Sequence, residues 1–154
     1  MHTLNDEMRD AIRLVKSEFM VYRNGVVADI LRQSGMPYKV IFGLQLPQIS
    51  EIASRLKSKL PSLQISELAR ELWNDTNVRE SRLLACKLMS SEKMESKTVL
   101  RMCREVQTQE EADFIVFTLL KDNPMIGTVR ETLSAEEGQK STLYVIKAID
   151  RFLQ

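Results

Sequence analysis

The chain has 154 residues, of which 44% are apolar, and this is enough to close one hydrophobic core. We therefore expect a single domain over residues 1–154, or one short repeat array, because a second full domain would need a longer chain. The 22 basic and 21 acidic side chains give a net charge of +1, which gives no sign of a strongly basic nucleic-acid binder, although the middle of the chain is more basic than its end.

Several kinds of catalytic centre are excluded by what the sequence lacks. The only histidine is His2, so histidine triads and HExxH zinc sites are ruled out. The glycine-rich motifs GxGxxG and GxxxxGK[ST] do not occur, so we expect no nucleotide cofactor. Cys86 and Cys103 lie in apolar helical patterns without a CxxC pair, which predicts buried thiols in a reducing compartment, not disulfides or a metal site.

No segment of the sequence is typical of a membrane protein. The longest uncharged stretch, residues 40–50, contains Pro47 and is well short of the roughly 18 residues that a membrane span needs. The start of the chain, MHTLNDEMRD, carries acidic residues and no apolar segment, so no signal peptide is expected. These features favour a cytoplasmic location without a membrane partner.

Helical periodicity runs along the whole chain. The first predicted helix carries an apolar stripe from Met8 to Tyr22 and ends near residues 24–25. A second helix covers about residues 26–33, and an irregular segment that could be extended follows at residues 38–46. Pro47 opens the next helix, since proline suits the first helical position. The remaining helices are predicted as pairs: 65–74 with 78–89, 95–106 with 109–121, and 124–133 with 136–153.

Helix starts are marked by capping signals in the second half of the chain. Thr108 with Glu111, and Ser134 with Glu137, have the spacing of a capping box, in which a hydroxyl and a carboxylate satisfy otherwise unpaired backbone N–H groups. Asn123, followed by a proline, is typical of a helix cap. The run at residues 114–120 has the composition of a buried strand, but the capping box before it and the absence of a partner strand favour a helix.

The predicted elements indicate an all-α fold. First members of successive pairs begin about 30 residues apart, which favours a short α-solenoid of stacked antiparallel helix pairs, that is, a HEAT/armadillo-like superhelix. The HEAT-like pairs occupy residues 47–154, while residues 1–46 supply the N-terminal helices and the irregular segment. A closed bundle of the same helices is the alternative, because periodicity alone does not distinguish the two.

Three segments carry a family resemblance. Residues 43–53 read GLQLPQISEIA, residues 67–73 read ELARELW, and residues 78–85 read VRESRLLA. A G-x-x-x-P helix start, followed by an L-A-x-x-L-W helix and an R-E-x-x-x-L-A helix, resembles the DNA alkylation repair family of HEAT-like DNA glycosylases. The resemblance extends from Gly43 to about residue 121, and the chain is shorter than typical members. Most of the matching residues are of types that shape helix entries and helix packing.

The resemblance implies a monofunctional DNA glycosylase that removes positively charged alkylated purines by hydrolysing the N-glycosidic bond. It further implies duplex DNA as the partner, basic side chains that hold phosphates, and neither a metal nor another cofactor. The family's W-x-x-x-D stretch matches residues 109–113, so Asp113 is implied as the catalytic carboxylate, with Gln109 where the family has an aromatic residue. A later segment with an aromatic residue and an arginine matches near Gly138 and Lys140, which implies Lys140 as the DNA contact there.

Basic residues of the middle of the chain are the candidates for phosphate contacts: Arg79, Arg82, Lys93, Lys97, Arg101 and Arg104. The last four stand at i, i+4, i+8 and i+11, so they form a basic stripe along one predicted helix. They would bind DNA if their helices share one concave face, because the summed positive potential attracts the phosphate backbone. The alternative is an ordinary solvated face, since Glu95 and Glu105 interleave with the stripe.

Two interpretations also stay open for the acidic residue and for the function. Asp113 is either a catalytic carboxylate in a water-poor cleft or a negative charge that the dipole near a helix start favours without any function. The chain as a whole is either a DNA-binding protein of the alkylation repair type or a catalytically inactive α-solenoid scaffold that binds a protein or peptide. A DNA-binding relative without chemistry is the third possibility.

Overall fold

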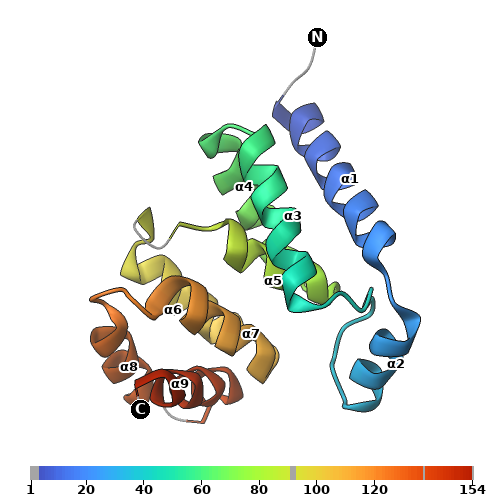
Figure 1. Ribbon diagram of the computed structural model, residues 1–154. Coiled ribbons are helices and arrows are strands. Elements are labelled where there is room, and N and C mark those ends of the chain that lie inside the picture. The colour runs from blue at the N-terminus through green and yellow to red at the C-terminus, as the bar shows by residue number, and fades with distance from the viewer. Residues whose placement is uncertain (1–3, 91–92, 137, 154) are drawn as a thin grey trace. The chain divides into compact units, whose positions relative to one another are not determined.

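The computed structural model describes residues 4–90, 93–136 and 138–153, and Figure 1 shows their course. His2 and Glu137 lie outside these ranges. Within them the chain is helical, and the only β pairing is an isolated parallel bridge between Val40 and Val78. No helix in these ranges is long and apolar enough to cross a membrane. The chain divides into two compact units, Met1–Leu88 (unit 1) and Met89–Gln154 (unit 2), and the division falls inside the run of predicted helix pairs.

Unit 1 is built from helices whose positions agree with the sequence prediction. They are α1 (Leu4–Tyr22), α2 (Gly25–Gln33), α3 (Leu46–Lys59), α4 (Ser62–Asn74) and α5 (Arg79–Leu88). Helix α3 has Pro47 in its first turn, as predicted, and α4 begins three residues earlier than expected, directly after Pro61. Helix α5 packs against both α3 and α4, and it is buried along almost all of its length. The core of unit 1 is therefore organised around α5, with the indole of Trp73 fully buried beside it.

The predicted break after the first helix is confirmed. Oδ1 of Asn24 accepts hydrogen bonds from the N–H groups of Val26 and Val27, at 3.1 and 3.2 Å, so the asparagine caps α2. The segment after α2 is irregular, as expected, and Tyr38 and Ile41 from this segment pack on α2. These contacts bring the irregular segment back against the first helices.

One buried carboxylate holds the irregular segment in place. Glu80, in the first turn of α5, accepts hydrogen bonds from the N–H groups of Phe42, Gly43 and Leu44 at 2.9, 3.1 and 3.3 Å. The Arg79 guanidinium donates both to Glu80, at 2.7 Å, and to the carbonyl of Leu44, at 2.9 Å. The Arg-Glu pair of the R-E-x-x-x-L-A segment thus satisfies backbone groups of a buried loop, which explains its presence structurally.

Gly43 of the G-x-x-x-P segment is required by close backbone packing. Its φ of +86° lies in the left-handed region, and a Cβ atom there would come 2.2 Å from the carbonyl oxygen of Asn24 and 2.9 Å from the backbone nitrogen of Ala28. The loop therefore touches the first turn of α2 backbone to backbone, which only glycine permits.

Unit 2 contains the remaining helical elements. They are α6 (Ser96–Glu105), α7 (Gln109–Ile115), the π-helical turn η2 (Val116–Leu120), α8 (Ile126–Ser134) and α9 (Lys140–Leu153). The helical interpretation of residues 114–120 is confirmed, with the refinement that its second part is a π-helix that continues α7. Cys103 is buried in α6, and its burial raises the pKa of the thiol to about 12.

The capping predictions in unit 2 have different outcomes. Oγ1 of Thr108 accepts from the N–H of Glu111 at 3.1 Å, which confirms this cap, and the Glu111 carboxylate also accepts from the N–H of Gln107 at 3.0 Å. Oδ1 of Asn123 accepts from the N–H of Met125 at 3.0 Å and caps the turn before α8. The predicted helix cap at Ser134 is wrong, because Ser134 is the last residue of α8 and its hydroxyl donates to the carbonyl of Arg130.

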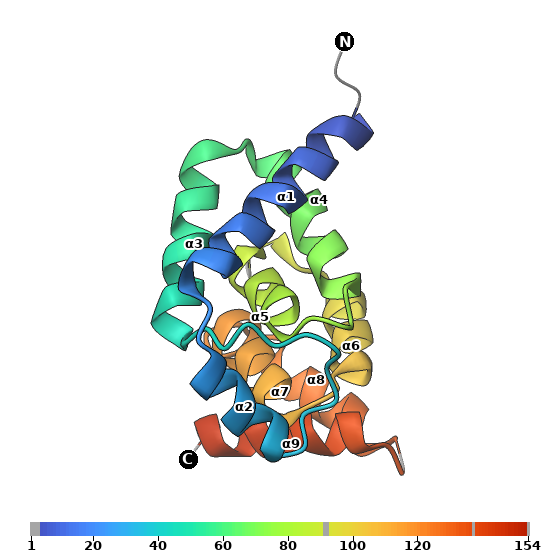
Figure 2. The same cartoon turned by 90° about the vertical axis from the view of Figure 1, so that its right-hand side faces the viewer.

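The helices of unit 2 stack as successive layers. Helix α8 packs against α9, which follows it in the chain, and α6 packs against both α8 and α9. Helix α7 with η2 also packs against α9, so α6 with α8 and α7 with α9 are alternate helices that lie next to each other. Figure 2 shows α7 alongside α9 in the lower part of the view. Stacking of first members on first members and second members on second members is the arrangement of an α-solenoid. The predicted all-α, solenoid-type fold class is thus confirmed.

Candidate functional site

Asp113 lies on α7, on the face that meets α9. Its side chain is 31% exposed, and both carboxylate oxygens are engaged. Oδ1 accepts a hydrogen bond from Nε2 of Gln109 at 3.0 Å, and Oδ2 lies 3.2 Å from a guanidinium nitrogen of Arg151. The carboxylate is thus held in a fixed orientation at the edge of the α7–α9 contact, open to solvent on one side.

Arg151 is the residue of this site that the sequence did not reveal. It belongs to the last turn of α9, 38 residues after Asp113, and its side chain is 55% exposed. No local spacing links the two positions, because the packing of α9 on α7 alone brings them together. The sequence offered one weak signal for this residue. The resemblance implies an arginine near residues 138–141, and Arg151 is the first arginine after that segment.

Gln109 connects the carboxylate to α9 a second time. Its Nε2 atom donates to Oδ1 of Asp113 and, at 2.8 Å, to the backbone carbonyl of Tyr144. The residue therefore forms a polar bridge between α7 and α9. It fixes one oxygen of Asp113 while Arg151 fixes the other.

Arg79 and Arg82, expected as phosphate contacts, are instead buried in unit 1. Their exposed fractions are 3% and 1%. Arg79 binds Glu80 and a loop carbonyl, as described above, and Arg82 stacks 3.5 Å over the ring of Trp73 and donates to the backbone carbonyl of that residue at 2.5 Å. The prediction that Arg79 and Arg82 contact phosphates is therefore wrong, because a guanidinium buried in the core is not accessible to a phosphate. The segment that contains both arginines therefore serves the packing of unit 1 and not the binding of DNA.

The basic stripe of unit 2 is exposed, with one change. Lys97, Arg101 and Arg104 lie on the exposed face of α6, whereas Lys93 precedes the helix, which begins only at Ser96. Arg101 has Glu105 within 3.9 Å, so its charge is partly balanced by that residue. The stripe therefore presents cations to solvent on one helix, as the spacing predicted.

Arg104 differs from the rest of the stripe because it has a close carboxylate partner. Its Nε and one terminal nitrogen donate to the same Oε1 atom of Glu136, at 2.8 and 2.5 Å. These hydrogen bonds raise the pKa of Arg104 and hold the pKa of the Glu136 carboxyl below its usual value. Arg104 thus contributes less free positive charge than Lys97.

Lys140 is exposed at the first residue of α9, at the opposite end of this helix from Arg151. The two positions are eleven residues apart, which corresponds to about 16 Å along a helix axis. The structure therefore does not bring Lys140 next to Asp113, and a contact of this lysine with DNA would be a peripheral one.

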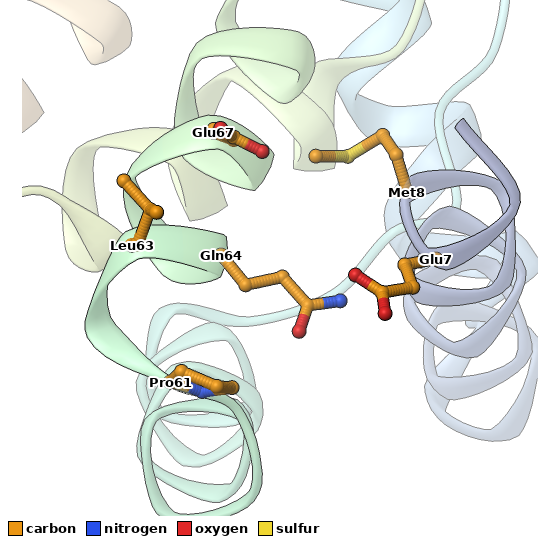
Figure 3. Close-up of a pocket in the computed structure, with 6 residues that line it drawn as sticks. All are labelled: Glu7, Met8, Pro61, Leu63, Gln64 and Glu67. Carbon is orange, nitrogen blue, oxygen red and sulfur yellow. The ribbon is translucent and has the colours of Figure 1, made fainter. Parts of the chain in front are cut away.

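A groove in unit 1 is lined by none of these residues. It has a volume of about 150 Å³ and is lined by α1 and the start of α4: Glu7, Met8, Pro61, Leu63, Gln64 and Glu67. Figure 3 shows the amide of Gln64 and the carboxylate of Glu7 facing each other across it. Two carboxylates at its rim would repel a phosphate, so the groove does not fit the predicted nucleic-acid contacts.

Comparison with known proteins identifies one family. The family model described as "DNA alkylation repair enzyme" matches residues 15–137 of the chain. This range includes α1 to α8 apart from the first turns of α1, and it contains Gln109, Asp113 and the exposed stripe of α6. No curated protein and no solved structure matches the chain. The match covers most of the chain, and the chain belongs to the DNA alkylation repair enzyme family.

Proposed function

We propose that the protein excises cationic alkylated purines from duplex DNA by hydrolysis of the N-glycosidic bond. In this reaction a water oxygen forms a bond to C1′ of the deoxyribose, and the C1′–N9 bond breaks. The base takes the bond electrons and leaves as a neutral molecule, since its positive charge is cancelled, and the water proton is released to solvent. No oxidant, reductant or metal enters this balance.

The geometry of Asp113 is the observation that carries the proposal. The carboxylate is oriented by Gln109 and Arg151, and part of it faces solvent, where a deoxyribose could approach. As the glycosidic bond lengthens, positive charge develops on the sugar, and a fixed negative group beside it stabilises the transition state more than the ground state. Orientation before the reaction avoids the cost of reorganising the carboxylate during it.

Exposed cations of unit 2 would supply the DNA contact. We assign phosphate binding to these side chains: Lys93, Lys97, Arg101, Arg104 and Lys140. Each phosphate neutralised by a protein cation releases condensed counterions, so affinity falls steeply as salt rises. Replacing both Lys97 and Arg101 by alanine should reduce the slope of log K against log salt by roughly two, at about 0.9 per phosphate contact.

Excision of 7-methylguanine from a duplex oligonucleotide tests the catalytic assignment. Asp113→Asn keeps the size of the side chain but removes its charge, and we expect excision to fall by at least about a hundred-fold, as for loss of one preorganised electrostatic group. Binding of the same duplex should change little. Asp29→Asn, the same substitution at an exposed position of α2, is the matched control. Equal excision by the Asp113 variant and the wild type would disprove the catalytic role.

A salt titration separates the remaining interpretations. If the affinity for duplex DNA falls steeply with salt but the wild type excises nothing, the protein is a DNA-binding relative without catalytic activity. In that case, the contacts of Gln109 and Arg151 with Asp113 have only a structural role. Weak salt dependence and no duplex binding would favour a scaffold that binds a protein or peptide, because burial of apolar surface responds little to salt of this concentration.

A further inference from the structure

An aromatic pair stands at the surface of unit 2. The ring of Phe117, in η2, is 50% exposed, and its centroid lies 5.7 Å from that of Phe152 in α9, with an angle of 45° between the ring planes. Phenylalanine has no polar group that would gain from this exposure, and half-exposed phenyl rings bind other flat or apolar groups well. The pair is therefore a candidate contact surface.

Phe117 belongs to a π-helical turn and points outward from it. The N–H of Lys121 bonds to the carbonyl of Val116 at 2.7 Å, an i to i+5 hydrogen bond. Around the same turn, Val116, Leu119 and Leu120 are buried, while Phe117 is directed to solvent. Single π-helical turns are uncommon, and they occur frequently at functional sites.

The aromatic pair is continuous with the site of Asp113. Phe117 follows Asp113 by four residues on the same helical run, and Phe152 follows Arg151 directly on α9. The Asp113–Arg151 ion pair and the Phe117–Phe152 contact are thus consecutive links between the same two elements. Gln109 with the carbonyl of Tyr144 is the link before them. The carboxylate and the exposed rings consequently lie at neighbouring positions along one contact.

A cation lies beside one of the two rings. The ammonium group of Lys121 lies 4.8 Å from the centroid of Phe117, and the side chain of Lys121 is exposed. The half-exposed side chain of Arg151 belongs to the residue that precedes Phe152 in α9. An exposed aromatic ring with a cation beside it matches a nucleotide, whose base stacks on a ring while its phosphate meets an ammonium group.

We propose that Phe117 and Phe152 form a stacking platform for a DNA base, with Lys121 as the contact for the adjoining phosphate. The placement of this platform next to a catalytic centre rests on the proposed function, whereas the stacking itself does not. An aromatic surface four residues after Asp113 would serve where Gln109, four residues before it, offers no ring. In this proposal, the ammonium group of Lys121 leaves the ring and binds the phosphate when the base stacks.

Fluorescence of Phe117→Trp tests the contact directly. A thymidine oligonucleotide added to this variant should quench the emission of the new indole, because stacked bases quench tryptophan. The native Trp73 is buried in unit 1 and gives a constant background. Unchanged emission at saturating oligonucleotide would overturn the proposal.

Affinity of the full chain for a duplex that carries 7-methylguanine provides the second measurement. Phe117→Leu should raise Kd about ten-fold, within the range that stacking of one base contributes, while Phe117→Tyr should keep wild-type affinity. Leu143→Ala, at a 62% exposed position of α9, is the matched control for loss of exposed apolar surface. An equal effect of Leu143→Ala would overturn the platform.

The outcomes distinguish this proposal from the proposed function. If the wild type excises 7-methylguanine and Phe117→Leu changes neither Kd nor excision, the platform is wrong and the glycosylase proposal stands. If the wild type excises nothing but the Phe117→Trp variant is quenched by DNA, the platform stands and the glycosylase proposal fails. Quenching by an apolar peptide in place of DNA would also overturn the platform.

Discussion

A guanidinium nitrogen of Arg151 lies 3.2 Å from Oδ2 of Asp113, across the contact between α9 and α7. The pair joins positions 38 residues apart, and Gln109 holds the other carboxylate oxygen. Arg151 touches no reacting atom in the proposed reaction, so we regard it as a positioning residue. Its effect on catalysis would come from the direction in which it holds the carboxylate.

Replacing Arg151 should therefore lower catalysis more than stability. We expect Arg151→Gln to lower kcat for excision of 7-methylguanine about ten-fold, and Arg151→Lys to recover part of the loss. The free energy of unfolding should change by no more than about 1 kcal/mol, because the ion pair is partly exposed to solvent. Excision kinetics and urea unfolding measure the two effects. A loss of kcat that Lys does not relieve at all would contradict the positioning role.

Glu80 should contribute strongly to the stability of unit 1. Glu80→Gln replaces one acceptor oxygen by an amide group that faces backbone N–H donors, and it leaves Arg79 without its carboxylate. We expect a loss of about 2–4 kcal/mol in the free energy of unfolding, typical of a broken buried network. Urea denaturation measures it. Glu71→Gln, at an exposed position of α4, should stay within about 0.5 kcal/mol of wild type.

Two glycines with positive φ should respond differently to alanine. At Gly43 the new Cβ would meet the backbone of Asn24 at 2.2 Å, so we expect a loss of about 3–5 kcal/mol from strain and overpacking together. At Gly35, with φ of +95°, a Cβ meets open space, and only the backbone cost of about 1–2 kcal/mol applies. Thermal and urea unfolding of the two variants measure the difference. Equal losses would show that the close approach at Gly43 is relaxed by movement of the loop.

The pair of Arg130 and Asp150 predicts a pH dependence within unit 2. Hydrogen bonds from Arg130, at 2.6 and 3.0 Å, lower the pKa of the Asp150 carboxyl below its ordinary value of 3.8. Since the folded-state pKa is depressed, the stabilisation is present above pH 3.8 and is lost as the pH falls through the folded-state pKa. Arg130→Gln should return the pKa toward 3.8, as measured by NMR titration of the carboxyl carbon.

The same pair provides a control for this titration. The stability difference between wild type and Arg130→Gln should be constant near neutral pH and should vanish in acid, when Asp150 is protonated in both proteins. Arg70→Gln, at an exposed position of α4 in unit 1, should leave the titration of Asp150 unchanged. A stability difference that persists in acid would mean that Arg130 acts through packing and not through its charge.

Much of the helical layout could be predicted from local patterns. Three such features are the break at Asn24, the proline in the first turn of α3 and the cap at Thr108. Each depends only on residues within four positions, so the local sequence is enough to predict it. The cap at Ser134 was predicted wrongly for the same kind of reason. A serine ahead of acidic residues fits a helix start, but its hydroxyl can equally bond back to a carbonyl of the helix that it ends.

The sequence by itself determined the fold class and the order of helices, because helical periodicity and capping are local properties, and the family resemblance pointed to Asp113 as the candidate carboxylate. Only the tertiary structure decided which charges face solvent. From the sequence, Arg82 and Arg101 are both arginines in predicted helices and look alike. In the structure, Arg82 stacks on the buried indole of Trp73, whereas Arg101 is exposed to solvent. The partner of Asp113 was likewise decided by the packing of α9 on α7, since an ion pair between distant positions forms only when the intervening chain folds back.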